Sequence, residues 1–145
     1  MHGATFAKDA IKSGAVAILT DAEGAALVKD MPTLIVGNPR KSAAILSSWF
    51  FGEPMRDLFT IGITGTNGKT TVSTLCHQIF QSAGQESGLI GTVETRIGNE
   101  VLASTRTTPE AAELQSLVAT MRERHCRNLV MEVSSHAIAL ERIRG

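Results

Sequence analysis

Residues 58–71 decide the fold, and they read LFTIGITGTNGKTT. The first half, from Leu58 to Thr64, is apolar enough for a strand that is buried in a sheet. A glycine-rich loop follows from Gly65 to Gly68, and apolar residues then recur at helical spacing from Lys69 to Ala83. A strand, a glycine-rich loop and a helix in this order are typical of a loop that binds the phosphates of a nucleotide.

The loop meets the physical requirements of phosphate binding, although the Walker A pattern needs a glycine at the position of Ile63. Glycines allow backbone N–H groups to turn toward an anion, and the positive end of the following helix attracts it. Lys69 can reach the β- and γ-phosphates, and the Thr70 hydroxyl can bind Mg²⁺. We therefore expect ATP and Mg²⁺ as cofactors. The expected ATP-binding residues are Gly65, Thr66, Asn67, Gly68, Lys69, Thr70 and Thr71. A glycine-rich turn with an accidental lysine is the less favoured alternative.

Helices and strands alternate along the whole chain. Before the phosphate loop we expect a helix over 4–13, a strand over 15–19, a helical turn over 25–29, a strand over 33–36 and a helix over 39–51. After the helix over 69–83 we expect strands over 87–91, 92–97 and 101–104, a helix over 108–125, a strand over 128–133 and a helical turn over 134–140. The alternation predicts the α/β class, with helices covering a parallel sheet. Gly52-Glu53-Pro54 interrupts the pattern and predicts a domain boundary.

Local signals refine three of these elements. Gly98-Asn99 predicts a hairpin turn between the strands over 92–97 and 101–104. Thr108 is expected as the N-cap of the next helix, with Pro109 in its first turn. Apolar spacing predicts one apolar face on each of two helices, formed by Ala43, Leu46, Trp49 and Phe50, with Trp49 as a packing anchor, and by Val72, Leu75, Cys76, Ile79 and Phe80.

The composition is that of a globular protein, with 43% hydrophobic and 19% charged residues. Fourteen basic residues balance fourteen acidic ones, so nothing points to nucleic acid or an anionic membrane as partner. Because the chain has neither a long apolar run nor a signal peptide at its start, we expect no membrane insertion and a cytoplasmic location. Cys76 and Cys126 lack metal-ligand spacing and are expected to be reduced packing residues.

Further candidate residues follow the later strands. Glu132 ends an apolar strand, where ligands bind in open α/β sheets. A buried carboxylate there needs Mg²⁺ or a basic partner, and the sequence leaves both open. Thr107-Thr108 is either a capping pair or a pair of hydroxyls beside the phosphate loop. Ser134-Ser135-His136 is favoured as a helix cap over a catalytic pair, and Arg142 is by default a solvated charge.

Three motifs together resemble the Mur ligase family. Residues 61–71, IGITGTNGKTT, are similar to the phosphate loop of these ligases, which also departs from Walker A. The segments TTPEA at 107–111 and MEVSSHA at 131–137 narrow the resemblance to the branch that adds the third residue of the peptidoglycan peptide, in its actinobacterial form. The resemblance is highly specific over residues 60–142 and weaker over residues 1–57.

The resemblance implies an α/β fold with two partial domains. Residues 1–57 would be the later part of a smaller α/β UDP-binding domain, and residues 58–145 the first part of the ATP-binding central domain, with a parallel sheet and the phosphate loop. It also implies roles for single residues. Lys69 and Glu132 would be catalytic, and Thr70 and Glu132 would hold Mg²⁺. The residues expected to bind UDP-N-acetylmuramoyl-L-alanyl-D-glutamate are Thr107, Thr108, Ser134 and Arg142.

The implied activity is an ATP-dependent ligation through an acyl phosphate, in cell-wall synthesis. The added amino acid would be meso-diaminopimelate, with L-lysine as the alternative, and the full-length enzyme would be a monomer acting on small molecules. The recognition domain for the amino acid is missing, so we expect these 145 residues alone not to ligate. The alternatives are a ligase similar to folylpolyglutamate synthase and a nucleotide-binding module without catalysis.

Overall fold

The computed structural model describes residues 2–29, 31–104 and 106–145. It contains two compact units, residues 1–43 and residues 44–145, and the division falls within helix α3 (Pro39–Phe50). This division between compact units does not test the domain boundary expected between residues 57 and 58, which stays a prediction. None of the helices in the described ranges is long and apolar enough to cross a membrane.

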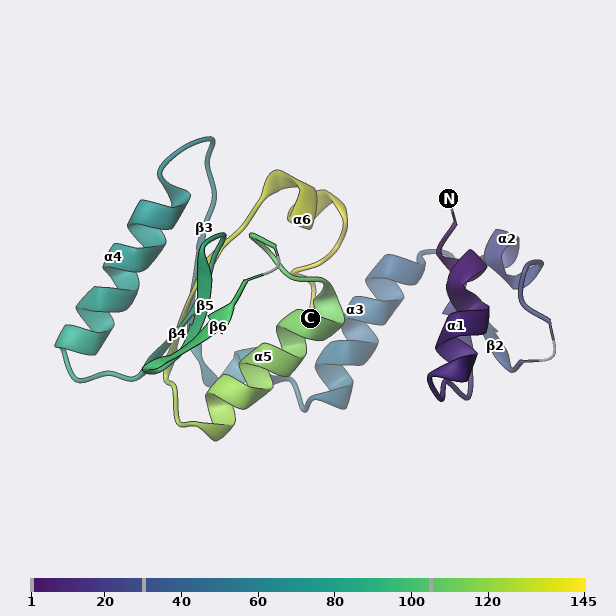
Figure 1. The fold of residues 1–145 in the computed structure, drawn as a ribbon, viewed down its shortest axis with the longest axis horizontal. Helices are drawn as coiled ribbons and strands as arrows, with labels where there is room; N and C mark the ends of the chain where they lie inside the picture. Colours follow the sequence, from purple (N-terminus) through teal and green to yellow (C-terminus); the bar gives the residue numbers. More distant parts are fainter. Residues whose placement is uncertain (1, 30, 105) are drawn as a thin grey trace. The chain divides into compact units, whose positions relative to one another are not determined.

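The first unit is built around two short parallel strands, β1 (Ile18–Thr20) and β2 (Thr33–Ile35). Its helical elements are η1 (Gly3–Phe6), α1 (Ala7–Lys12) and α2 (Ala22–Ala25), which are labelled in part in Figure 1. The strand predicted over 15–19 begins only at Ile18, because that is where pairing with β2 begins. The helical turn lies earlier than predicted, because the Asp21 carboxylate caps it by accepting a hydrogen bond from the Gly24 amide at 2.8 Å.

The second unit contains a five-stranded sheet with the order β3-β7-β4-β5-β6. Its strands are β3 (Phe59–Ile63), β4 (Ser87–Ile90), β5 (Glu94–Ile97), β6 (Glu100–Ala103) and β7 (Asn128–Glu132). The first three strands of that order are parallel, and β5 and β6 form the predicted antiparallel hairpin at one edge. The α/β class and the parallel part of the sheet are therefore confirmed.

Two helices cover this sheet. Helices α4 (Lys69–Ser82) and α5 (Ala111–Glu123) lie on opposite faces, as Figure 1 shows. The shorter elements of the unit are η2 (Pro54–Asp57) and α6 (Ser135–Ala139). The core lies between the sheet and α5 and is formed largely by Ile90, Leu114, Val118, Met121, Leu129 and Met131. It also buries Cys126, and burial raises the pKa of this thiol above its ordinary value.

The apolar face predicted for α4 is largely exposed. Val72, Leu75 and Ile79 are exposed, with Ile79 at 67% of its surface, whereas Ser73 and His77 are buried. The buried side faces the sheet, where α4 packs mainly against β7 and β4 and also against β3. Within that side, Ser87 Oγ lies 2.8 Å from Nδ1 of His77. Periodicity identified the apolar side of the helix, and on that side only the end near Phe80 has a ring neighbour among the described residues, Phe59, at 6.4 Å between ring centroids.

The apolar face predicted for α3 is exposed too. Trp49 is 71% exposed, and Leu46 and Phe50 are exposed as well. Ala44 and Ser48 are the residues of this helix that are buried. Small residues allow the helix to lie close to its neighbours, so its large apolar side chains face outward. The expected role of Trp49 as a packing anchor is therefore contradicted.

Candidate nucleotide-binding site

A pocket of about 410 Å³ lies at the carboxyl ends of the parallel strands β3, β4 and β7. Its lining comes from four separate segments of the chain. The lining residues are Thr66, Asn67, Gly68, Lys69, Thr70, Thr71, Thr92, Thr107, Glu132 and Ser134. This is the edge at which open α/β sheets bind their ligands. The structure thus brings most of the predicted site residues into one pocket.

The phosphate loop connects β3 to α4. Gly65 and Gly68 have φ angles of 144° and 80°, which favour glycine because a Cβ would strain the backbone. The helix begins at Lys69, so its free N–H groups and its positive end face the loop. The Lys69 ammonium donates a hydrogen bond to the Gly65 carbonyl oxygen at 2.8 Å. A cation and several backbone donors therefore surround a space that suits the terminal phosphates of a nucleotide.

Glu132 is the only carboxylate in the pocket lining, and it is 1% exposed. Both of its oxygens accept hydrogen bonds from Thr92: Oε1 from the amide at 3.0 Å and Oε2 from the hydroxyl at 3.1 Å. The sequence left Mg²⁺ and a basic side chain open as partners of this carboxylate. In the described part of the chain, no lysine or arginine bonds to it. The carboxylate consequently remains available to a cation inside the pocket.

The donor set fits Mg²⁺ rather than a transition metal. Among the described residues no group of three His, Cys, Asp or Glu side chains is close enough to hold a metal alone. Mg²⁺ is usually held by one or two carboxylates together with phosphate oxygens and water. Glu132 and the Thr70 hydroxyl line the same pocket as the phosphate loop, so they could hold Mg²⁺ that a nucleotide also binds.

Thr107 and Ser134 also line the pocket. The hydroxyl oxygens of Thr107 and Thr92 are 2.9 Å apart. Ser134 caps α6, as predicted, because its Oγ accepts a hydrogen bond from the Ala137 amide at 3.1 Å. Both residues therefore combine a structural contact with a position at the pocket wall.

Thr108 and Arg142 do not line this pocket. Thr108 is buried, donates to the Glu132 carbonyl at 2.8 Å and accepts from the Ser134 amide at 3.1 Å. The N-cap predicted at Thr108 is wrong, because this position is taken by Glu110 and the hydroxyl is committed to β7. Arg142 forms an ion pair with Glu110 at 2.9 Å and donates to the Thr108 carbonyl at 3.3 Å, so it is not a solvated charge.

Sequence reasoning missed Thr92 and the neighbouring Gly91. The strand signal of the hairpin extended over Thr92 and concealed the end of β4, which the structure places at Ile90. The usable signal was the Gly-Thr pair directly after a buried parallel strand, since such strand ends meet at the ligand-binding edge. The partner, Glu132, is forty positions away in the sequence, and no local pattern could have linked the two.

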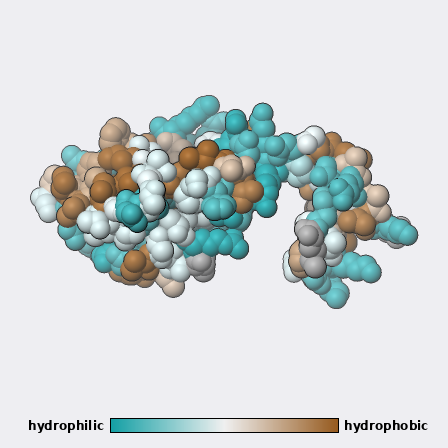
Figure 2. Space-filling view, turned by 90° about the horizontal axis from the view of Figure 1, so that it is seen from above, coloured by the Kyte–Doolittle hydropathy of each residue, from teal (hydrophilic) through white to brown (hydrophobic). Residues whose placement is uncertain are grey.

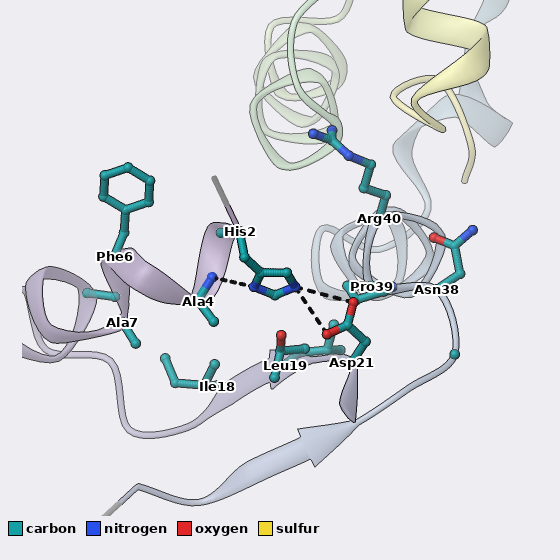
Figure 3. Close-up of a pocket in the computed structure, with 14 residues that line it drawn as sticks. His2, Ala4, Phe6, Ala7, Ile18, Leu19, Asp21, Asn38, Pro39 and Arg40 are labelled. Atoms are coloured by element: carbon teal, nitrogen blue, oxygen red, sulfur yellow. Dashed lines mark hydrogen bonds and ion pairs between the residues drawn. The ribbon is translucent and has the colours of Figure 1, made fainter. Parts of the chain in front are cut away.

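The first unit has a pocket of its own, of about 580 Å³. Figure 3 shows His2 between η1 and the end of β1, with its Nδ1 accepting from the Ala4 amide at 3.1 Å and its Nε2 3.1 Å from Asp21 Oδ1. The hydrogen bond from the Gly24 amide and the contact with His2 lower the pKa of Asp21 below its ordinary value. Asn38 and Arg40, at the start of α3, lie on another side of this pocket.

Comparison with known proteins agrees with this arrangement. The profile of the Mur ligase middle domain matches residues 63–145. Three relatives are named UDP-N-acetylmuramoyl-L-alanyl-D-glutamate–2,6-diaminopimelate ligase, and they come from Streptomyces avermitilis, Corynebacterium efficiens and Bacillus velezensis. Their sequence identities to this chain are 50%, 46% and 42%, and each alignment covers 99–100% of the chain. The chain spans only 28–29% of the length of these relatives.

A solved structure of a ligase with the same name superposes with a TM-score of 0.77 at 26% identity. The superposition covers 98% of this chain and 28% of that one. Since the family profile matches more than half of the chain, the chain belongs to the Mur ligase family.

Proposed function

We propose that the chain is the nucleotide-binding part of an ATP-dependent ligase that adds 2,6-diaminopimelate to UDP-N-acetylmuramoyl-L-alanyl-D-glutamate in peptidoglycan precursor synthesis. The observation that carries the proposal is the meeting of Lys69, Thr70 and Glu132 in one pocket at the carboxyl ends of parallel strands. The names of the relatives supply the substrates. They favour diaminopimelate over L-lysine, and this ligase over one similar to folylpolyglutamate synthase.

The proposed reaction has two steps. The terminal phosphoryl group of ATP is first transferred to the free carboxylate of the D-glutamate residue, and ADP is the leaving group. The amino group of the diamino acid then attacks the acyl phosphate, loses a proton, and displaces inorganic phosphate as the amide forms. Phosphoryl transfer depends chiefly on positioning and on stabilisation of negative charge, and the phosphate loop is suited to both.

Lys69 would stabilise the phosphate that is transferred. Its ammonium now donates to a neutral carbonyl, Gly65 O. Binding of a triphosphate would exchange this acceptor for an anionic oxygen, which forms a stronger hydrogen bond. The residues assigned to the phosphates of ATP are those from Gly65 to Thr71. Thr70 and Glu132 would hold Mg²⁺, which, when bound, neutralises charge on the phosphate oxygens.

The UDP-linked dipeptide would bind at Thr107, Thr108, Ser134 and Arg142. Thr107 and Ser134 already line the pocket, whereas Arg142 would exchange its ion pair with Glu110 for a group of the substrate. Residues 1–57 would belong to a UDP-binding domain. We expect the longer protein to be a cytoplasmic monomer that acts on small molecules and not on nucleic acid.

The test of this function is Lys69→Ala in the full chain, with ATP affinity measured by calorimetry in the presence of Mg²⁺. A hydrogen bond to a charged group contributes about 1.5–3 kcal/mol, so affinity for ATP should fall roughly ten- to hundredfold. Lys8→Ala is the matched control, since Lys8 is an exposed lysine of α1 outside the pocket, and it should bind ATP normally. Unchanged affinity in Lys69→Ala would remove the basis of the proposal.

A further inference from the structure

Thr92 contacts two side chains that belong to different parts of the candidate site. It follows β4 directly after Gly91, and the Gly91 amide donates to the Glu94 carbonyl at 3.1 Å, which fixes the turn. Its amide and its hydroxyl bind different oxygens of the Glu132 carboxylate. The same hydroxyl lies 2.9 Å from the hydroxyl of Thr107. One exposed side chain thus connects the ends of β4 and β7 with the segment before α5.

Gly91 makes this contact geometrically possible. A Cβ at this position would lie 2.6 Å from Oε1 of Glu132, closer than real Cβ contacts, and 3.6 Å from the Glu94 carbonyl oxygen. The carboxylate therefore occupies space that only a glycine leaves open. Two hydrogen bonds on one side and the Gly91 backbone on the other confine Glu132 to one orientation within the pocket.

The single proton of the Thr92 hydroxyl determines the direction of the remaining bond. A carboxylate is a stronger acceptor than a hydroxyl, so Thr92 donates its proton to Glu132 Oε2. Its oxygen can then accept from Thr107. A chain of hydrogen bonds runs from Thr107 through Thr92 to Glu132, and a ligand that alters the bond at Thr107 also alters the bonding of the carboxylate.

We propose that Thr92 is a positioning residue that orients the Glu132 carboxylate for the divalent cation and couples it to the Thr107 side of the pocket. This inference rests on the proposed function, because it takes Glu132 as a metal ligand and Thr107 as a substrate contact. Hydrogen bonds from groups behind a ligand fix its orientation, and their loss typically weakens metal binding about ten- to hundredfold.

The first experiment measures Mn²⁺ binding to the full chain in the presence of ADP by electron paramagnetic resonance, without turnover. Thr92→Val keeps the shape of the side chain and removes its proton, and it should weaken Mn²⁺ binding roughly ten- to hundredfold. Thr92→Ser keeps the hydroxyl and should restore binding close to that of the wild type. Affinity for ADP without metal should be the same in all three proteins, which also reports that the variants are folded.

The second experiment tests the coupling by combining Thr92→Val with Thr107→Val. If the chain of hydrogen bonds exists, Thr107→Val alone weakens Mn²⁺ binding, but it has little further effect once Thr92 is already valine. Strictly additive effects would overturn the coupling. Wild-type Mn²⁺ affinity in Thr92→Val would overturn the positioning role.

These results are separable from the fate of the proposed function. If Lys69→Ala lowers ATP affinity while Thr92→Val leaves Mn²⁺ binding unchanged, only the role of Thr92 is refuted. If Lys69→Ala leaves ATP affinity unchanged, the proposed function fails at its own test, whatever the Mn²⁺ titration gives.

Discussion

His77 is a titratable residue that the fold buries in the second unit. It is 4% exposed, lies on the sheet side of α4 and contacts the Ser87 hydroxyl through Nδ1. Burial lowers the pKa of His77 below its ordinary value; Arg96 lowers it further, and Glu94 and Glu86 oppose the shift. The folded state therefore favours the neutral imidazole, which can exchange a hydrogen bond with Ser87.

Acid should consequently destabilise the fold through His77. Below an ordinary histidine pKa of about 6.5, the unfolded chain binds a proton that the folded chain resists, so the free energy of unfolding falls as the pH drops toward the lowered pKa. We expect urea unfolding to show a smaller loss of stability between neutral and mildly acidic pH in His77→Gln than in the wild type. His136→Gln, at an exposed site, is the control. An equal acid sensitivity in His77→Gln and the wild type would contradict this assignment.

At the scale of elements, the contact between β4 and α5 depends on a missing side chain. A Cβ on Gly88 would collide with the sulfur and methyl groups of Met121, which is fully buried. Gly88→Ala should overpack the core and lower the free energy of unfolding by about 1–3 kcal/mol, as measured by chemical denaturation.

A second substitution distinguishes this clash from a general intolerance of the strand. Met121→Ala alone should be destabilising by about 2–5 kcal/mol, since it leaves a cavity. In combination with Gly88→Ala, the added methyl group occupies part of that cavity, so the double variant should be less destabilised than the sum of the two single variants. Full additivity would mean that the two residues do not interfere.

Elements with local punctuation could be predicted from the sequence. β3, α4 and β7 lie within a residue or two of their expected bounds. Gly65, Gly68 and Gly84 mark the ends of β3 and α4, whereas β7 stands out as a short, fully buried run. The packing of helices could not be predicted in the same way. Spacing identified the apolar side of α4, but which side is buried depends on the neighbours that the chain provides, and here those neighbours cover Ser73 and His77.

The candidate site also has one part that local sequence predicts and one part that depends on distant segments of the chain. The phosphate loop is contiguous, and its glycines, lysine and threonine could be recognised together. Thr92 and Glu132 come together only through the pairing of β4 with β7. A threonine before a proline predicts a cap for the nearest helix, whereas the Thr108 hydroxyl donates to the Glu132 carbonyl of the distant strand β7.

At the scale of the whole molecule, many large apolar side chains lie outside the core and are exposed. Phe50 and Ile79 are 75% and 67% exposed, and Figure 2 shows hydrophobic residues in several separate patches on the visible surface. The relatives are more than three times as long as this chain, and that additional length would offer partners for such surfaces.

We therefore expect these 145 residues not to complete the ligation. The residues that line the pocket suit phosphates and a cation, and under the proposed function none of them binds the diamino acid. Phosphate release should be absent when the chain is given ATP, the UDP-linked dipeptide and diaminopimelate, and present when a chain of the relatives' full length is used. Turnover by the shorter chain would show that all reacting groups lie within it.

The pairing of β3 with β7 has a consequence for how the protein folds. The phosphate loop begins at the end of β3, whereas α4, β4, the hairpin and α5 lie between it and Glu132 along the chain. Contacts between such distant segments form slowly, because the intervening loop must first be closed. During synthesis, the phosphate loop leaves the ribosome well before Glu132 does. ATP with its metal ion would therefore stabilise the sheet only once β3 and β7 have paired, because binding then favours the folded state by mass action. Before that pairing its binding site is incomplete, so the nucleotide could not assist the folding of the later half of the chain.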